Sequence, residues 1–418
     1  MRIVHLPLDR RRLIGGALIA PALLSLPAVS FAASPALPPA IAPPERLTRL
    51  AKARVLMKRD GLGAILVEPG ASLDYFTGVR WSRSERLTAA LIPASGDPII
   101  VTPFFEKPSV AESLEIPAEI RTWDEHDEPL KLVADRLREL NITAAPLGIE
   151  ETNRFFIVDR LQAELPRLKL RNANSVVRGC RMTKSPAEIA LMQAASDITI
   201  AAIRETHAKL REGMAPAHIS TLLQAAMVAR GGSNPWALVL LGEASAYPHG
   251  TGKPQAVRRG EVVLIDTGCA VRGYQADISR SFVFGAAPTH EQRRVWEQVA
   301  QGQMIAMQAA RIGAAAGSVD DAVRAAYTRW GYGPDYKLPG LSHRTGHGIG
   351  MEGHEPVNLV RGETTRLAPG MCFSNEPGIY LPGKFGIRLE DCFHMTAAGP
   401  AWFSRPPGSI DDPVGSRA

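Results

Sequence analysis

The chain has 418 residues, of which 45% are apolar and 22% are charged. This composition is typical of a globular protein with one or two domains and a substantial core, and it excludes an intrinsically disordered chain. The formal charge of +6 at pH 7 falls to about +3 without the arginine-rich N-terminal segment, which we expect to be removed. A net charge this small gives no case for a nucleic-acid partner.

Four cysteines are spread along the chain, at Cys180, Cys269, Cys372 and Cys392. No C-x-x-C pair is present, so the sequence predicts neither a zinc–thiolate site nor a disulfide framework. We expect all four side chains to lie in the core.

The N-terminus has the pattern of an export signal. An arginine cluster at 10–12 precedes an apolar run at 13–29, and small residues up to Ala32 suit cleavage there. The paired arginines resemble a twin-arginine signal, and an ordinary secretory signal with extra arginines is the alternative. The apolar run holds about 17 residues and contains Pro21 and Pro27, whereas a spanning helix needs about 20. We therefore predict a twin-arginine-like signal peptide at 1–32, a periplasmic location, and no stable membrane insertion after cleavage.

An α/β domain is predicted at 45–177, after an Ala/Pro-rich linker at 33–44. Short apolar runs predict strands at 63–67, 87–92, 98–102 and 146–149. Helical periodicity lies between them, at 45–60, 130–140 and 153–165. This domain contains no group of residues that we can assign to chemistry.

A second domain is predicted at 178–410, followed by a short tail at 411–418. Three helix starts carry a capping residue with a polar partner three positions later: Ser185 with Glu188, Thr289 with Gln292, and Ser318 with Asp321. A helix pair, strands, a second helix pair and further strands follow one another. This order predicts an α+β domain in which helix pairs flank an antiparallel sheet built from two similar halves.

Two acids stand out in the strand–turn–strand segment at 262–277, Asp266 and Asp277. A symmetric hairpin that turns between Val271 and Arg272 would place them directly opposite each other, with Cβ atoms roughly 5 Å apart. Two carboxylates this close are unfavourable in a buried strand unless a proton or a cation lies between them.

The same pattern recurs at 373–392, where a hairpin centred on Gly383 would place Glu376 opposite Glu390. Opposed acids in two buried hairpins are hard to explain by structure alone. Two independent surface pairs are the alternative interpretation, and a bulge could spoil either pairing.

A glycine-rich loop between the hairpins carries His343, His347 and His354. One neutral imidazole and four carboxylates make an oxygen-rich site for two divalent ions such as Mn²⁺, Co²⁺ or Zn²⁺. The segment that follows is not a helical zinc-protease motif, because Pro356 breaks the helix and Asn358 stands where a second histidine is needed.

These motifs resemble those of the pita-bread metallopeptidases, which include methionine aminopeptidase, prolidase and aminopeptidase P. The N-terminal domain resembles the creatinase-type domain of the prolidase branch, so the resemblance covers nearly all of the chain after the signal. It implies the pita-bread fold. It also implies that Asp266 binds one metal, that His347 and Glu376 mainly bind the other, and that Asp277 and Glu390 bridge both.

Four further residues match the family's substrate-contacting and supporting positions: His249, His343, His354 and Arg388. Taken alone, His249 would be an ordinary loop histidine and Arg388 a sheet-edge ion pair. The resemblance implies that Glu376 carries a proton from the attacking water to the leaving nitrogen. It also implies that one or more of the three histidines stabilise the oxyanion.

The resemblance implies a dinuclear-metal exopeptidase that cleaves the Xaa-Pro bond of dipeptides or short peptides. Mn²⁺ is the expected ion, with Co²⁺ or Zn²⁺ as alternatives, and a homodimer is expected. The short hairpin between the two glutamates leaves dipeptidase and aminopeptidase activity open. The alternative function is a two-metal hydrolase of the same fold that acts on a non-proline peptide or another small C–N substrate. A binding protein that merely retains the fold would have lost ligands, and none is lost.

Overall fold

The structure is a computed structural model that describes residues 36–415. The predicted signal peptide at 1–32 lies outside the described residues, as do residues 33–35 of the predicted linker and 416–418 of the predicted tail. Within the described range, no helix combines the length and the apolar character needed to cross a bilayer.

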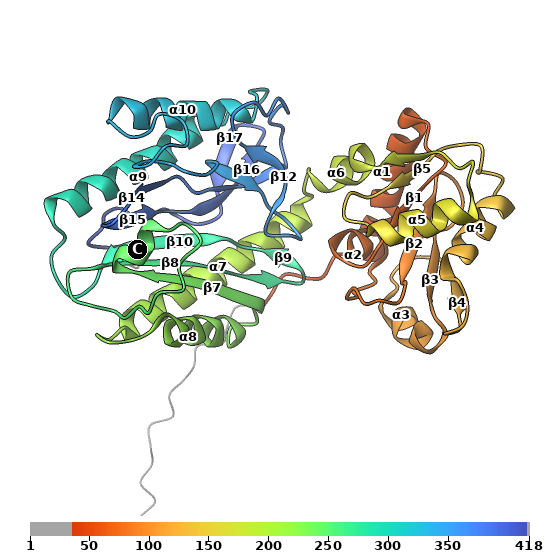
Figure 1. The fold of residues 1–418 in the computed structure, drawn as a ribbon, viewed down its shortest axis with the longest axis horizontal. Helices are drawn as coiled ribbons and strands as arrows, with labels where there is room; N and C mark the ends of the chain where they lie inside the picture. Colours follow the sequence, from red (N-terminus) through yellow and green to blue (C-terminus); the bar gives the residue numbers. More distant parts are fainter. Residues whose placement is uncertain (1–35, 416–418) are drawn as a thin grey trace, which may run out of the picture. The chain divides into compact units, whose positions relative to one another are not determined.

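A six-stranded mixed sheet forms the centre of the N-terminal domain, drawn in orange and yellow in Figure 1. Its strands, in the spatial order β4-β3-β2-β1-β5-β6, are β1 (Ala64–Val67), β2 (Ala89–Pro93), β3 (Ile99–Pro103), β4 (Glu119–Trp123), β5 (Leu147–Ile149) and β6 (Leu170–Asn172). Strand β2 is antiparallel to β1 and β3, and the remaining pairs are parallel. The apolar runs that predicted strands supply β1, β2 and β3, which are buried at every residue.

Helices cover both faces of this sheet. They are α1 (Pro43–Asp60), α2 (Ala71–Thr77), α3 (Lys107–Ser113), α4 (Pro129–Glu139), α5 (Phe155–Glu164) and α6 (Asn174–Arg181), with a 3₁₀ turn η1 (Phe104–Glu106). Because successive side chains of a strand point to opposite faces, Ile65 and Val67 of β1 join one core with α1, α2 and α6. Ala64 and Leu66 join a second core with α4 and α5.

Helix α6 runs through the predicted domain boundary at residue 177. Its Val176, Val177 and Cys180 lie in the same core as the buried face of α1. The core of the N-terminal domain therefore extends to Cys180, and the first helix of the next domain begins after Ser185.

Two helix pairs belong to the C-terminal domain: α7 (Pro186–Lys209) with α8 (Pro216–Val228), and α9 (His290–Ala309) with α10 (Gly317–Arg329). The predicted capping box at Ser185 is confirmed, because its Oγ accepts the N–H of Glu188 at 3.2 Å and the Glu188 carboxylate accepts the N–H of Ser185 at 2.8 Å. Thr289 and Gln292 form the same reciprocal pair at the start of α9.

The predicted cap at Ser318 is wrong. Helix α10 begins at Gly317, two residues earlier than a cap at Ser318 predicts, and it has no side-chain cap. The Ser318 hydroxyl instead donates to the carbonyl of Ala315 at 2.6 Å. A serine in the first turn can bond to nearby backbone in this way, so its presence does not fix the start of a helix.

The strands of this domain form two sheets and a short ladder (green to blue in Figure 1). The first sheet, of order β10-β8-β7, contains β7 (Ser233–Leu241), β8 (Val262–Val271) and β10 (Ile278–Val283), with β9 (Tyr274–Gln275) paired to β8. The second, of order β12-β11-β13-β16-β17, contains β11 (Gly346–Gly348), β12 (Glu355–Leu359), β13 (Cys372–Asn375), β16 (Asp391–Thr396) and β17 (Gly399–Trp402). The ladder joins β14 (Gly378–Leu381) to β15 (Phe385–Arg388), and a 3₁₀ turn η2 (Gly242–Ala246) follows β7.

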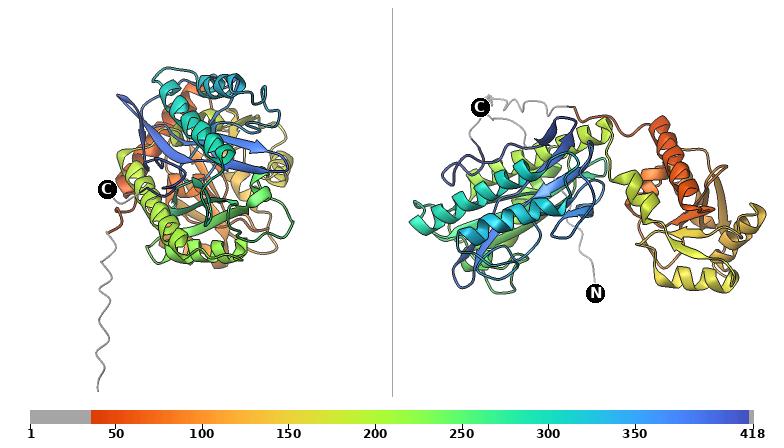
Figure 2. Two further views of the ribbon diagram at one scale, coloured as in Figure 1. Left: turned by 90° about the vertical axis from the view of Figure 1, so that its left-hand side faces the viewer. Right: turned by 90° about the horizontal axis from the view of Figure 1, so that it is seen from above.

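Each helix pair packs on its own half. Helices α7 and α8 contact β8 and β7, whereas α9 contacts β13 to β15 and α10 contacts β12. Figure 2 shows α9 and α10 lying side by side. The predicted arrangement of two similar halves, each with strands and a helix pair, is therefore confirmed.

The two sheets meet at Ser279 of β10 and Glu390, the residue before β16. The backbone N–H of Ser279 donates to the carbonyl of Glu390 at 3.2 Å, and the N–H of Glu390 donates back at 3.1 Å. This reciprocal pair joins the two halves, and we call the place where they meet the seam.

The predicted register of the first hairpin is wrong. The turn is formed by Arg272 and Gly273, with φ of 50° and 89°, so Asp266 lies opposite Ser279 and not opposite Asp277. A two-residue turn with both φ values positive matches the twist of a hairpin. Because a shift of two residues keeps every side chain on its own face, Asp266 and Asp277 still share a face as diagonal neighbours.

The predicted register of the second hairpin is confirmed. Gly378 pairs with Arg388 in the β14–β15 ladder, and Asn375 pairs with Asp391 in the β13–β16 ladder. Both ladders have the same register, so Glu376 and Glu390 occupy opposed positions between them.

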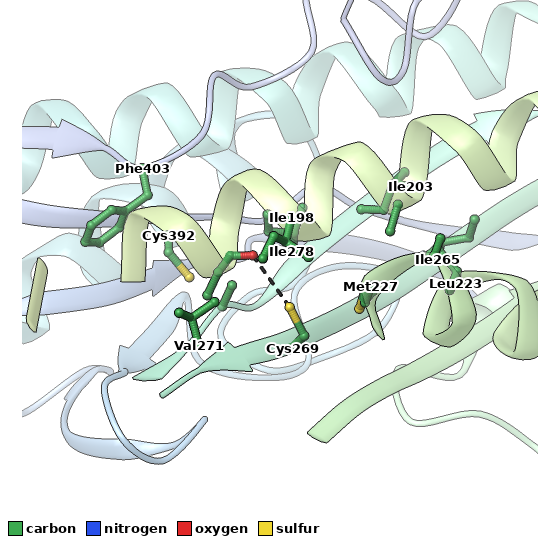
Figure 3. Close-up of a cluster of buried hydrophobic side chains, with 14 of the residues drawn as sticks. Ile198, Ile203, Leu223, Met227, Ile265, Cys269, Val271, Ile278, Cys392 and Phe403 are labelled. Atoms are coloured by element: carbon green, nitrogen blue, oxygen red, sulfur yellow. Dashed lines mark hydrogen bonds between the residues drawn. The ribbon is translucent and has the colours of Figure 1, made fainter. Parts of the chain in front are cut away.

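All four cysteines are buried and free, as predicted. Figure 3 shows Cys269 and Cys392 among the apolar side chains contributed by α7, α8, β8 and β10. This core, which also contains Cys372, holds the first sheet against α7 and α8.

Two buried ion clusters connect the N-terminal segments to the C-terminal domain. In the first, Glu355 accepts hydrogen bonds from Arg181 Nη2 at 2.6 Å and from Lys184 Nζ at 2.9 Å. The same carboxylate accepts the backbone N–H groups of Met351 and Glu352. Glu355 therefore fixes the conformation of the loop that carries His354.

In the second cluster, Arg49 of α1 lies between the domains. Its guanidinium donates to the carbonyl of Tyr75 and to the hydroxyl of Tyr274, both at 3.1 Å. It also pairs with Glu188 at 3.3 Å. Tyr274 follows the turn of the first hairpin, so this contact ties α1 to the strand pair that carries Asp266 and Asp277.

The first cluster makes a pH-dependent contribution to stability. Burial alone would raise the pKa of Glu355, but Lys184 and Arg181 outweigh it and lower the pKa from 4.5 to about 2. Since the folded pKa is the lower one, this stabilisation is fully present above pH 4.5 and is lost as the pH falls toward 2. We expect Glu355→Gln to reduce the free energy of unfolding at pH 7 by about 3 kcal/mol, with a smaller difference at acidic pH.

Urea denaturation of wild type and variant across this pH range checks the prediction. The control is Glu125→Gln, which removes an exposed partner of Arg86 and should change stability little. A loss of stability in Glu355→Gln that did not vary with pH would contradict the assignment.

Candidate metal centre

The five residues predicted as metal ligands lie together at the seam. Potential ligand atoms of Asp266, Asp277 and Glu390 lie within 4.8 Å of one another, and so do those of His347, Glu376 and Glu390. Glu390 belongs to both groups. The geometry is that of one centre with two neighbouring positions, and the ligand roles themselves stay a prediction.

Two carboxylate oxygens in this centre, Asp277 Oδ1 and Glu390 Oε1, are buried and have no hydrogen-bond partner among the described residues. Burial first, and then the charge of Asp266, raise the pKa of Asp277 well above its usual value. Burial and then Asp277 do the same to the pKa of Glu390. Buried oxygens that lack partners and repel one another are stabilised by a cation, so the donor set fits two divalent ions.

His347 is held in the form that binds a metal. Its Nδ1 lies 3.0 Å from the carbonyl of Gly348, so Nδ1 carries the proton and Nε2 has a free lone pair. Nε2 lies 3.3 Å from Glu376 Oε1 and 3.7 Å from Asp277 Oδ2. Burial and the neighbouring His354 lower the pKa of His347 to about 3, which keeps the ring neutral.

Asp266 is oriented by Arg388 and Ser279. Arg388 Nη2 donates to Asp266 Oδ2 at 2.6 Å, and Arg388 Nε donates to Ser279 Oγ at 3.0 Å. Ser279 Oγ lies 3.0 Å from Asp266 Oδ1 and 2.9 Å from Glu390 Oε2. Because a hydroxyl has one proton, Ser279 donates to one of these carboxylates at a time.

The opposite face of the seam is held by a buried ion pair between Arg280 and Asp391, which are 1% and 0% exposed. Arg280 Nη2 donates to Asp391 Oδ1 at 2.7 Å, and its Nη1 donates to the carbonyls of Ser279 and Glu390 at 2.9 Å. Since successive residues of a strand face opposite sides, this pair fixes the backbone of two site residues from behind. Removing one partner of such a pair costs about 3–5 kcal/mol.

The predicted accessory residue His343 forms a chain of hydrogen bonds with Tyr380 and Arg388. Its Nδ1 lies 2.8 Å from the carbonyl of Arg344, and its Nε2 lies 2.7 Å from Tyr380 Oη. Arg388 Nη1 donates to the same Oη at 3.1 Å, so the Tyr380 hydroxyl donates to His343. Burial and then Arg388 lower the pKa of His343 to about 3, and this ring is neutral too.

The other two predicted histidines lie at the edge of the centre. The exposed His354 ring stands edge-on to His347, with 4.1 Å between ring centroids. His249 is exposed in the turn after η2 and lines a hollow of about 480 Å³ beside β7. After burial, His249 is among the neighbours that lower the pKa of both His343 and His354, so it lies within electrostatic reach of each.

Two residues of the centre were missed by the sequence analysis, Ser279 and Tyr380. Side chains alternate between the two faces of a strand, so residues two or four positions apart lie on the same face. This rule could have identified both residues, because Ser279 lies two positions after Asp277 and Tyr380 lies four after Glu376. Their polar partners, however, come from other strands and cannot be recognised from the local sequence.

Two family descriptions match the chain. Residues 190–397 match the metallopeptidase family M24, and residues 49–183 match the creatinase/prolidase N-terminal domain. The M24 match spans all five predicted ligands.

Similar proteins cover most of this chain. A probable dipeptidase PepE of Mycobacterium tuberculosis is 33% identical over 360 residues, which cover 84% of this chain and 92% of that protein. An Xaa-Pro dipeptidase of Lactobacillus helveticus is 31% identical over 333 residues, covering 78% and 89%. The crystal structure of dipeptidase PepE from Mycobacterium ulcerans has a TM-score of 0.80 and 31% identity, covering 89% of this chain and 98% of that one.

The raised pKa of Glu390 predicts how stability responds to metal. An acid whose folded pKa is raised loses stability as the pH rises through that pKa. Metal-free Glu390→Gln should therefore be more stable than metal-free wild type at pH 7, by on the order of 1–3 kcal/mol. With Mn²⁺ present the order should reverse, because the variant lacks a ligand.

Denaturation with and without Mn²⁺ tests this reversal, and titration calorimetry gives the number of ions bound. Glu297→Gln, on the exposed side of α9, is the matched control and should follow the wild type. A wild type that gained no stability from any divalent ion would rule out the metal centre.

Proposed function

Because the chain belongs to metallopeptidase family M24, we propose that it is a two-metal exopeptidase that hydrolyses the Xaa-Pro bond of dipeptides or short peptides. The observation that carries the proposal is the meeting of four carboxylates and His347 at the seam, where Asp277 Oδ1 and Glu390 Oε1 are buried and have no partner among the described residues. The Xaa-Pro preference rests on the similarity to Xaa-Pro dipeptidases such as the one from Lactobacillus helveticus.

The centre would hold its two ions through distinct residues. Asp266 would hold one, His347 and Glu376 would mainly hold the other, and Asp277 and Glu390 would be shared by both. When bound, the two ions supply Lewis acidity that polarises the scissile carbonyl and lowers the pKa of water toward about 7. The oxygen-rich donor set favours Mn²⁺, with Co²⁺ or Zn²⁺ as alternatives.

Glu376 is the group that moves the proton. In the metal-free site burial raises its pKa to about 7, against the opposing effect of Arg388, so that without metal this carboxyl can gain or lose a proton near neutral pH. It takes the proton from the attacking water and delivers it to the leaving nitrogen. With proline as the leaving residue this nitrogen belongs to a tertiary amide, so its protonation is needed for the bond to break.

The histidines and Arg388 hold the reacting groups in place. His343 Nδ1 lies 3.9 Å from Glu376 Oε2. The rings of His354 and His347 are in edge-on contact. We assign to one or more of His249, His343 and His354 the stabilisation of the oxyanion that forms from the scissile carbonyl. Arg388 does not need to touch the substrate, because its guanidinium is occupied in orienting Asp266.

A panel of small peptides tests the activity. We expect the metal-stripped protein, reloaded with Mn²⁺, to release alanine from Ala-Pro or Ala-Pro-Ala but not from Ala-Ala-Ala, as followed by mass spectrometry. Glu376→Gln should reduce kcat by about 10²–10⁴-fold.

Parallel loading with Co²⁺ and Zn²⁺ identifies the preferred ion. Release from Ala-Ala-Ala alone would retain the metal chemistry and remove the proline specificity. Absence of release from every peptide, with two ions bound per chain, would point to the alternative of a non-peptide C–N substrate.

We also propose that the protein is exported to the periplasm and acts there as a homodimer. The support for export is the arginine pair followed by an apolar run at 13–29. A twin-arginine route carries folded proteins, which suits an enzyme that acquires its metal before export.

Replacing Arg10 and Arg11 by lysine should block export if the route is the twin-arginine one. We expect the wild type in the periplasmic fraction and the double variant in the cytoplasmic fraction, measured by immunoblotting after osmotic shock. Export of the double variant at the wild-type level would instead indicate an ordinary secretory signal.

A further inference from the structure

A buried ion pair in helix α10 contacts the short loop at residues 343–345, which leads into β11 and which we call the histidine loop. Asp320 and Arg324 stand four residues apart, so their side chains lie on one face of the helix. Arg324 Nε donates to Asp320 Oδ2 at 2.8 Å, and the two side chains are 2% and 0% exposed. Val319 and Val323 of the same helix lie in the core of the second half, so α10 is a fixed support for the pair.

Asp320 holds the end of the histidine loop. Its Oδ1 accepts the backbone N–H of Thr345 at 3.1 Å and the Thr345 hydroxyl at 2.7 Å. Its Oδ2 accepts the backbone N–H of Arg361 at 3.0 Å, in addition to the guanidinium of Arg324. Four donors from three segments of the chain therefore fix this carboxylate in place.

Arg324 holds the start of the same loop. Its Nη2 donates to the carbonyl of His343, and its Nη1 donates to the carbonyls of Leu341 at 3.0 Å and Asp335 at 2.6 Å. Asp320 thus binds N–H groups of the chain and Arg324 binds carbonyls. Hydrogen bonds with one ionised partner are roughly twice as strong as neutral ones, so the pair holds the loop firmly from both ends.

The histidine loop in turn holds the groups to which we assign proton transfer and oxyanion stabilisation. The carbonyl of Thr345 accepts the N–H of Glu376 at 2.9 Å, and His343 Nδ1 lies 3.9 Å from Glu376 Oε2. The predicted ligand His347 is held separately, because its N–H donates to Ser374 Oγ at 3.0 Å and it belongs to the β11–β12 ladder. A shift of the loop would therefore move His343 and Glu376 more than His347.

We propose that Asp320 and Arg324 are positioning residues for the peptidase reaction, which act through the histidine loop to place His343 and Glu376 against the scissile bond. The inference rests on the proposed function, because it takes Glu376 as the group that moves the proton. Placement of this kind acts on kcat, since a displacement of about 1 Å can cost on the order of 100-fold in rate.

A pair that only stabilised the fold would behave differently. Its replacement would lower the unfolding temperature, but the molecules that remained folded and loaded with metal would turn over substrate at the wild-type rate. A positioning pair lowers kcat in folded, metal-loaded protein. The comparison must therefore be made at a temperature where every variant is folded.

The experiment uses the Mn²⁺-loaded full-length mature protein. Asp320→Asn removes the negative charge at constant size, and Arg324→Lys keeps the positive charge but not the fork of donors. Thr345→Val removes one hydroxyl bond and leaves the ion pair intact, so it remains informative if the other two variants fail to fold. The matched control is Asp321→Asn, the same change at the next residue, whose exposed side chain pairs with Arg361.

We expect the three variants of the network to lower kcat for the proline peptide that wild type cleaves by about 10- to 100-fold, with the smallest loss in Thr345→Val. KM should change little, because neither member of the pair contacts the substrate. The Mn²⁺ content should equal that of wild type, since His347 keeps its own supports. Asp321→Asn should match wild type in all three measurements.

A wild-type kcat in the folded, metal-loaded forms of Arg324→Lys and Thr345→Val would overturn the proposal. A loss of bound Mn²⁺ that accounted for the whole fall in kcat would overturn it too, because the pair would then act on the metal ligands. Both results leave the peptidase function intact, since wild type still cleaves the peptide.

Amide hydrogen exchange tests the positioning without turnover. The N–H of Thr345 donates to Asp320, and the N–H of Glu376 donates to the carbonyl of Thr345. The N–H of His347 donates to Ser374 and serves as the internal reference. Exchange at single amides reports on local opening of the structure, and it can be followed by mass spectrometry with fragmentation to single residues.

Asp320→Asn and Arg324→Lys should speed exchange at Thr345 and Glu376 and leave His347 at its wild-type rate. This result would support the positioning role even if no peptide were cleaved and the proposed function failed. Wild-type exchange at Thr345 and Glu376 would overturn the role. Exchange that was faster by the same factor at all three amides would also overturn it, because the pair would then stabilise the fold as a whole.

Discussion

Repulsion among four carboxylates at the seam is the constraint on which the C-terminal domain depends. Asp266 and Asp277 come from one half, and Glu376 and Glu390 from the other, so the cluster exists only when both sheets have formed and met. The reciprocal backbone bonds between Ser279 and Glu390 hold the halves together at that point. The buried Arg280–Asp391 pair reinforces them from the opposite face. The fold thus gathers carboxylates that repel one another, which is the arrangement a cation-binding site requires.

Much of this organisation could be predicted from the sequence because the signals are local. Apolar runs identified the central strands, capping pairs marked the starts of α7 and α9, and Gly383 fixed the register of the second hairpin. The first hairpin was misregistered because a left-handed turn at Arg272 and Gly273 was not recognised. The error did not separate Asp266 from Asp277, since a shift of two residues leaves each side chain on its original face.

What the sequence could not supply are contacts between distant segments. Ser279 and Glu390 are 111 residues apart, and Tyr380 acts on His343 across 37 residues. Ligand types and their order can therefore be recognised along the chain, whereas the groups that set tautomers or orient carboxylates emerge only from the three-dimensional contacts.

The two buried ion clusters make the N-terminal domain a thermodynamic partner of the metal centre. One holds Glu355, directly after His354, and the other holds Tyr274, beside the turn that leads from Asp266 to Asp277. Any ligand that stabilises the centre must then also oppose separation of the domains, and the coupling is reciprocal. Substitutions along α1 or α6, remote from every predicted ligand, are therefore expected to change metal affinity.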